Sequence, residues 1–446
     1  MRLPAGRGTP LPQTSGVTQM MTLPPQMLVE ARLPGHALAD PAAEARARLG
    51  ALLTGGAWAG KRVAVAAGSR GIDRYASVVR AVVEALKASG TLPFVMPAMG
   101  SHGGATAPGQ VEVLEALGIT EATVGAPVQS SVDTVELGRS ALGFRVLCAR
   151  DAVEADAVVL VNRVKPHTDF ASTTLGSGLL KMSAIGLGKV EGAFECHRAA
   201  SRHGHEAVIL EASRLALARL PVVLGVAMVE DAHHRLARVE AMTGPEFGAR
   251  EPELLRQARD WMPSLPFPEI DVLVVDEMGK NISGAGMDTN IIGRGVNGLP
   301  REDRRATVRC LYVRGLTPES HGNAVGVGMA DVVSSRLLAG MDEHSTYMNA
   351  LSAMTPAMCR KPMHFDSDAE CLRAALRMAG VAPESARIVR VRNTLALDRL
   401  LVSAAFAPDL QGRGDLRVVV PSAEWSFTQA GDLDPAVDLL LAAAPA

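Results

Sequence analysis

The sequence predicts an α/β protein with two domains, mainly parallel sheets and an active site in the cleft between the domains. The chain has 446 residues, more than one hydrophobic core usually serves. Short apolar runs typical of buried strands alternate with longer amphipathic segments, the order found in βαβ units. A proline-rich stretch at residues 263–268 separates two such series and resists both helix and strand.

The first half shows four apolar runs that predict strands, each followed by a helical pattern or a glycine-rich loop. The strands are expected at residues 62–67, 93–96, 157–161 and 222–227. The helices are expected at residues 74–88, 109–117, 206–220 and 251–261. Because ligands of α/β proteins bind beyond the carboxyl ends of the strands, the loops after these runs are the first places to look for a site.

The second half repeats the pattern, with a strand at residues 270–275 directly after the prolines. Further strands are expected at residues 307–313, 388–391 and 417–420, and helices at residues 330–338, 369–379 and 435–443. We therefore expect a disordered leader (1–25), an N-terminal catalytic and cofactor-binding domain (26–265) and a C-terminal domain (270–446). The last helix is expected to pack back on the first domain.

Composition narrows the class of partner. The net charge is −2 and no stretch concentrates Lys and Arg, which argues against nucleic acid. No run approaches the ~18 apolar residues of a membrane helix, so no membrane is expected. Five scattered cysteines without a C-x-x-C pair fit a reducing cytoplasm. A small-molecule substrate is the expected partner, and a homo-oligomer is compatible with the sequence.

Chemically active side chains gather after the strand at residues 157–161. His167, Lys181 and His197 follow it within about forty residues, and His102 lies in an upstream loop of small residues. Apolar neighbours surround Lys181, so desolvation should lower the pKa of its amine and make it a competent nucleophile. Histidines beside such a lysine can bind a metal or move protons, which indicates an enzyme.

Two common nucleotide sites are poorly supported. Residues 186–189 (G-L-G-K) resemble the end of a phosphate-binding loop, but Ser183 replaces the upstream glycine and Val190 replaces the magnesium-binding hydroxyl. Neither domain begins with a G-x-G-x-x-G segment after a strand, so a standard nicotinamide dehydrogenase is not indicated.

Three histidines close in sequence could also supply imidazole ligands to zinc, nickel or copper: His197, His203 and His205. Arginines and a glycine interleave them, and this pattern favours a solvated helix end for His203 and His205.

At these residues the sequence resembles the nickel-dependent lactate racemase family and its wider group of 2-hydroxyacid racemases and epimerases. The glycine-rich turn G-S-G-L-L-K at residues 176–181 resembles the family's turn, and His197 follows its lysine after sixteen residues. The resemblance implies an isomerase that uses a nickel-pincer nucleotide, pyridinium-3-thioamide-5-thiocarboxylic acid mononucleotide. Lys181 would tether this group, Gly176, Ser177 and Gly178 would lie against it, and His197 would bind the nickel.

The resemblance also implies roles in substrate chemistry. His102 and His167 correspond to the family's two acid/base histidines, and Arg70 corresponds to the arginine that holds the substrate carboxylate. Lys280, in the second domain, is a candidate contact for a carboxylate or phosphate. Cofactor-biosynthesis proteins are implied as partners.

The chain departs from the family at several places. Residues 67–71 are A-G-S-R-G, where the family has an acidic residue followed by T-R-P. The segment between His167 and Lys181 is longer than in the lactate enzymes, and the loop around Lys280 differs too. We therefore expect a 2-hydroxyacid other than lactate. A metal-dependent hydrolase or lyase with His102, His167 and His197 as ligands, or a non-catalytic binding protein, are the alternatives.

Overall fold

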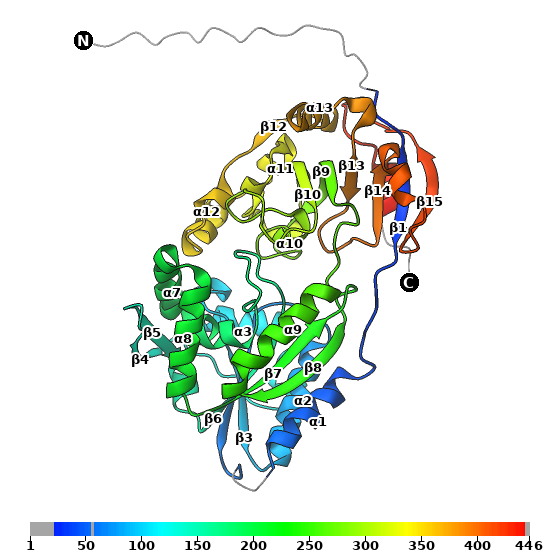
Figure 1. Ribbon diagram of the computed structural model, residues 1–446. Coiled ribbons are helices and arrows are strands. Elements are labelled where there is room, and N and C mark those ends of the chain that lie inside the picture. Colours follow the sequence, from blue (N-terminus) through cyan, green and yellow to red (C-terminus); the bar gives the residue numbers. More distant parts are fainter. Residues whose placement is uncertain (1–21, 55–57, 442–446) are drawn as a thin grey trace, which may run out of the picture.

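The computed structural model describes residues 22–54 and 58–441, so most of the predicted leader lies outside the described residues. Two lobes, each built on its own sheet, lie one above the other (Figure 1). The first lobe holds residues 41–261, and the second holds residues 22–31 and 269–441. The predicted α/β class with mainly parallel sheets is confirmed. No helix in the described ranges is long and apolar enough to cross a membrane.

The first lobe is built on a five-stranded sheet of order β3-β2-β6-β7-β8. Its strands are β2 (Arg62–Ala67), β3 (Leu92–Pro97), β6 (Ala157–Arg163), β7 (Val222–Glu230) and β8 (Leu236–Thr243). Neighbours run parallel except β8, which pairs antiparallel with β7. The central strands read as continuous apolar runs because helices cover both faces.

Alternate residues of these strands pack into two separate cores. Val63 and Val65 face α1 (Pro41–Leu52) and α2 (Tyr75–Ala88), whereas Ala64 and Ala66 face the opposite side. That side is covered by α7 (Lys189–His203), α8 (His205–Arg219) and α9 (Phe247–Trp261). The remaining elements are α3 (Ala107–Ala116), α4 (Glu121–Val124), α5 (Arg150–Val153), α6 (Leu179–Lys181) and a hairpin of β4 (Thr134–Arg139) and β5 (Arg145–Ala149).

The second lobe is built on an eight-stranded sheet of order β12-β11-β10-β9-β13-β14-β1-β15. The strands from β12 to β13 run parallel, and the last four alternate in direction. The strands are β1 (Gln26–Ala31), β9 (Glu269–Met278), β10 (Thr307–Leu316), β11 (Val332–Ser334), β12 (Met363–Phe365), β13 (Ile388–Val391), β14 (Arg399–Ser403) and β15 (Leu416–Ala423). The helices are α10 (Thr289–Ile292), α11 (Ser335–Ala339), α12 (Glu343–Ser352), α13 (Asp368–Ala379), α14 (Ala407–Leu410) and α15 (Pro435–Leu441).

Three sequence-based expectations are wrong at this level. The boundary at residue 26 placed β1 in the first domain, but β1 lies between β14 and β15, where Leu28 and Val29 are buried (Figure 1). The last helix packs on this same second sheet, with Leu441 against Leu28 and Leu401, and not on the first lobe. Residues 330–338 are not one helix, because Val332 and Val333 pair with β10 and α11 begins only at Ser335.

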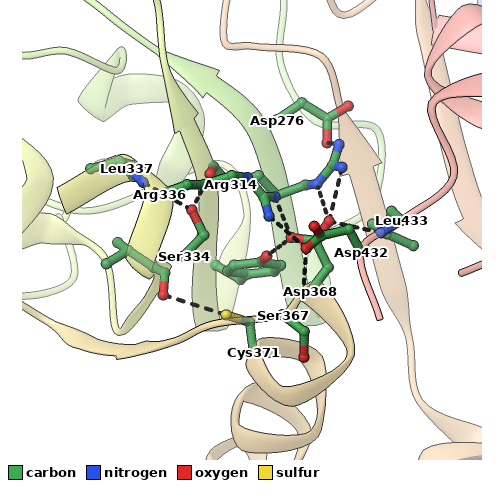
Figure 2. Close-up of polar contacts among 12 residues, drawn as sticks. Asp276, Arg314, Ser334, Arg336, Leu337, Ser367, Asp368, Cys371, Asp432 and Leu433 are labelled. Carbon is green, nitrogen blue, oxygen red and sulfur yellow. Dashed lines mark hydrogen bonds and ion pairs between the residues drawn. The ribbon is translucent and has the colours of Figure 1, made fainter. Parts of the chain in front are cut away.

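A buried charge network ties the C-terminal segment to the second sheet (Figure 2). The carboxylate of Asp368 is fully buried and accepts hydrogen bonds from Tyr312, from Arg314 and from the backbone N–H of Leu433. The Arg314 guanidinium also donates to Asp276 at 2.8 Å. Each charge has a partner of opposite sign, which is the condition under which buried charges are tolerated.

Two chain segments, residues 32–40 and 262–268, connect the lobes and lie side by side. The ring of His36, in the first segment, stacks on Trp261 at the end of α9, with 4.6 Å between ring centroids. The His36 N–H also donates to Asp231 at 2.9 Å. The covalent connections are therefore gathered at one side of the molecule.

Candidate active site

The predicted site residues of the first lobe lie along one edge of its sheet. Arg70 follows β2, His102 follows β3 and His167 follows β6. Because β2, β3 and β6 are parallel neighbours, their carboxyl ends meet at this edge. Lys181 ends the short helix α6, and His197 lies on α7.

The glycine-rich turn before Lys181 is shaped by close packing. A Cβ atom at Gly176 would lie 2.3 Å from the carbonyl oxygen of Lys165, and one at Gly178 would lie 2.4 Å from Oε1 of Glu251. Glu251, in α9, accepts a hydrogen bond from the N–H of Leu180 at 3.0 Å. These contacts explain why the turn needs glycine. A role of Gly176, Ser177 and Gly178 in binding a cofactor remains a prediction.

Lys181 has the desolvated amine that the sequence predicts. Burial lowers its pKa, the carboxylate of Asp169 opposes this, and the charge of Arg70 lowers it further. Within the described residues the amine makes no hydrogen bond and no ion pair. The group is therefore available to react with, or bind to, something other than protein.

His167 is buried and held in one tautomer. Burial, followed by the charge of Lys181, lowers its pKa to about 3, so the ring is neutral at pH 7. Its Nδ1 accepts a hydrogen bond from the backbone N–H of Asp169 at 3.0 Å. This contact assigns the ring proton to Nε2. The basic lone pair of the ring is on Nδ1, so this hydrogen bond must open before the ring can accept a proton.

His102 lies near three cationic side chains, those of Arg70, Lys181 and Lys280. Its Nδ1 is hydrogen-bonded to the hydroxyl of Ser69. Burial lowers the pKa of His102 well below its usual value, and the charges of Arg70, Lys181 and Lys280 act in the same direction. His102, Arg70, Lys181 and Lys280 are therefore close enough to interact electrostatically, although Lys280 comes from the other lobe.

Arg70 and Lys280 lie close together where the two lobes meet. A Cβ atom at Gly284, in the second lobe, would lie 2.5 Å from Nη2 of Arg70. Arg70 is exposed to solvent but has protein on most sides, and this burial lowers its pKa. Lys280 donates to the carbonyl of Gly284 and to Asn349, both at 2.7 Å. Burial, together with Arg70, lowers the pKa of Lys280 to about 8.

Three histidines are linked by ring contacts around Phe170. The ring of Phe170 stacks on His167, with 4.4 Å between centroids, and on His205 at 5.5 Å. His205 in turn meets His197 edge-on at 6.2 Å. Burial, and next the charge of Lys181, lowers the pKa of His197 to about 4, and its Nδ1 is buried without a partner in the described chain.

This arrangement corrects one expectation. His205 is not part of a solvated helix end, because Gly204, with a φ of 78°, turns the chain between α7 and α8 and brings His205 beside His197. His203, on the last turn of α7, is exposed as expected. The arginines between these histidines did not show in the sequence that His205 is partly buried while His203 is exposed.

Asp169 is a further residue that the sequence analysis missed. Its carboxylate accepts a hydrogen bond from the Thr168 hydroxyl at 2.8 Å. Burial alone would raise its pKa, but His167, the Thr168 hydroxyl and Lys181 outweigh burial and lower it. The carboxylate therefore stays ionised and balances part of the surrounding positive charge. Its position directly after T168 in the P-H-T-D segment is the only hint that the sequence offers.

Across the described ranges, no three side chains of His, Cys, Asp or Glu are placed so that they could hold a metal ion together. His102, His167 and His197 therefore do not form the three-ligand site that a hydrolase or lyase would use.

A family model described as "Domain of unknown function (DUF362)" matches residues 66–246. No curated protein matches the chain. The chain is similar to the structure of the lactate racemase apoprotein from Thermoanaerobacterium thermosaccharolyticum, with 12% identity and a TM-score of 0.51, covering 83% of this chain and 98% of that one. It is also similar to a crystal structure of a protein from Thermotoga maritima, with 16% identity and a TM-score of 0.48, covering 63% of this chain and 72% of that one.

The likeness to the lactate racemase apoprotein establishes a lactate racemase-like fold. At this identity it establishes the fold alone, so activity has to be argued from the site. The family match includes Arg70, His102, His167, Lys181 and His197, whereas Lys280 lies outside it.

Proposed function

We propose that the chain is a racemase or epimerase of a 2-hydroxyacid other than lactate, and that it uses a nickel-pincer nucleotide tethered to Lys181. One observation carries the proposal. Arg70, Lys181, His197 and His205 lie close enough for their charges to interact, directly or through Lys181, and none of these side chains makes a hydrogen bond or ion pair within the described chain. Partially buried polar groups without partners are costly, so a site built from them supports binding of a polar group.

The residues fit the implied cofactor. The desolvated amine of Lys181 could form the covalent link, and the neutral ring of His197, with its Nδ1 unpartnered, has the protonation state that a nickel ligand needs. The described residues offer no three-ligand protein cluster, which fits a metal that takes its other ligands from an organic group. When bound, the nucleotide supplies an acceptor for the hydride on the substrate's α-carbon.

The chain's own residues would hold the substrate and move its proton. Arg70 would bind the carboxylate with its unpaired guanidinium, and Lys280 from the second lobe would add positive charge. His102 and His167 are neutral at pH 7 because of their lowered pKa values, so each can take the hydroxyl proton of one enantiomer. His167 would first release the N–H of Asp169. Return of the hydride and the proton to the opposite face of the oxidised substrate gives the 2-hydroxyacid with inverted configuration.

Hydride removal suits this substrate class physically. Direct removal of the α-proton of a hydroxyacid would create a carbanion beside a carboxylate, which gains little stabilisation. Loss of hydride with loss of the hydroxyl proton gives a 2-keto acid instead. Since the cofactor must be made and installed, the proposal includes cofactor-biosynthesis proteins as partners.

The test is intact-mass and nickel analysis of the chain co-expressed with pincer-cofactor biosynthetic enzymes. We expect a stoichiometric adduct with nickel in the unmodified sequence, no adduct in Lys181→Ala, and adduct without stoichiometric nickel in His197→Ala. Racemisation of a panel of 2-hydroxyacids is then measured with the loaded protein. Absence of both adduct and nickel sinks the proposal, and an adduct without turnover of any panel member indicates a cofactor-binding protein instead.

A further inference from the structure

An arginine from the second lobe forms hydrogen bonds with the backbone of the loop that carries His167. We propose that Arg301, in the segment between α10 and β10, is a positioning residue that fixes residues 167–170, so that the first lobe's acid/base loop depends on the second lobe for its shape. The catalytic meaning of this loop rests on the proposed function, whereas the positioning itself does not.

Arg301 contacts the backbone of the loop at three residues. Its Nη1 donates to the carbonyl oxygens of Thr168 at 3.0 Å and His167 at 3.4 Å, and its Nη2 lies 3.5 Å from that of Phe170. Thr289, in α10, also donates to the Thr168 carbonyl at 2.7 Å and accepts from Nη1 of Arg301 at 3.2 Å. The second lobe thus supplies hydrogen bonds to three of the four residues of the loop.

The guanidinium is itself held firmly. Asp303 accepts two hydrogen bonds from it, at 2.9 and 3.0 Å, and the side chain of Arg301 is only 4% exposed. Asp303 also lies 3.6 Å from Arg259 in α9 of the first lobe. A buried, paired guanidinium in a planar fork loses little freedom when it binds several carbonyls, and lysine cannot reproduce this geometry.

Fixing these carbonyls fixes the groups that do the chemistry. The Thr168 carbonyl belongs to the same peptide unit as the N–H of Asp169, which sets the tautomer of His167. The Phe170 carbonyl belongs to the residue whose ring stacks between His167 and His205. A second cross-lobe contact, the 2.9 Å ion pair of Lys165 and Asp288, lies just before the loop. The guanidinium of Arg301 is occupied by these carbonyls, by Thr289 and by Asp303, so we assign it no role in binding the substrate.

The first readout does not require activity. We compare hydrogen–deuterium exchange of peptides covering residues 164–173 in the unmodified protein, in Arg301→Lys and in Arg309→Lys. Arg309 is an exposed arginine on β10 whose side chain pairs with Asp271, away from the first lobe. We expect faster exchange of the loop in Arg301→Lys, with the rest of the first sheet unchanged, and no change in Arg309→Lys. Unchanged exchange in Arg301→Lys would overturn the positioning role.

The second readout is kinetic and uses the cofactor-loaded enzyme with the 2-hydroxyacid found in the panel. Misplacing a catalytic group by about 1 Å can cost about 10²-fold in rate, so we expect kcat to fall by that order while KM changes only a few-fold. A rise in KM at constant kcat would contradict the proposal, since it would mark Arg301 as a substrate-binding group.

Asp303→Asn keeps Arg301 but removes its charged partner. This variant tests the same positioning role if Arg301→Lys fails to fold. We expect a smaller change of the same kind in loop exchange and in kcat. If the loop exchanges faster in the variants while the unmodified protein has no racemase activity, the positioning role stands and the proposed function fails.

Discussion

Replacing Glu251 by Gln should change how stability depends on pH. The carboxylate of Glu251 supports the turn that carries Lys181, with one oxygen bound to the N–H of Leu180 and the other buried without a partner in the described chain. Burial raises the pKa of Glu251 to about 7 from its ordinary value of 4.5. Glutamine preserves the shape and the accepting oxygen, but it cannot ionise.

The sign and size of the change in stability with pH follow from the raised pKa of Glu251. A folded-state pKa above the unfolded one means that the protonated carboxyl contributes stability fully below about pH 4.5, and that this contribution is lost as the pH rises through 7. Each pKa unit corresponds to about 1.4 kcal/mol, so the loss is about 3 kcal/mol. Between pH 5 and pH 8 the stability of Glu251→Gln relative to the unmodified protein should therefore rise by up to about 3 kcal/mol.

Urea unfolding at several pH values measures this difference, and Trp261 lies in the same helix as Glu251 and reports its unfolding by fluorescence. Using the difference between two proteins removes the contributions of the buried histidines, which are common to both. Glu253→Gln, an exposed position on α9, is the control and should stay within about 0.5 kcal/mol at every pH. A flat difference curve for Glu251→Gln would refute the reasoning.

Two further predictions concern stability and are checked by urea unfolding. Gly178→Ala should cost about 1–3 kcal/mol, because its Cβ would overlap the Glu251 carboxyl group, whereas Gly248→Ala, with open space around it in a helix, should be neutral or stabilising. Arg314→Met should cost about 3 kcal/mol, because it removes the buried guanidinium shared by Asp276 and Asp368 and leaves Arg390 and Arg336 as their arginine partners. Arg417→Met, at an exposed ion pair, should cost less than about 1 kcal/mol. Equal losses within either pair would contradict the assigned contacts.

The sequence was most informative where local pattern and tertiary structure agree. The strands of the first sheet are covered on both faces, so their apolar runs stand out, and the loops that follow them necessarily meet at one edge. The approach of Arg70, His102 and His167 could therefore be predicted from their positions after β2, β3 and β6.

Elements whose environment comes from distant residues could not be predicted in this way. β1 is a strand because β14 and β15 flank it, and these lie more than 360 residues away. His205 and His203 have similar sequence surroundings, and only the turn at Gly204 separates their environments. Arg301 reaches the His167 loop from a segment with no recognisable motif, so its contacts depend on how the two lobes meet.

The position of β1 decides how this molecule can be divided. The first lobe is a single continuous stretch of chain inserted between β1 and β9, so a fragment of residues 32–265 contains its entire sheet. A fragment that begins at residue 266 lacks β1, and both β14 and β15 would then present unsatisfied edge hydrogen-bonding groups to each other across an empty place. Shortened versions made for biophysical work should therefore join residues 22–31 to the second half through a short linker.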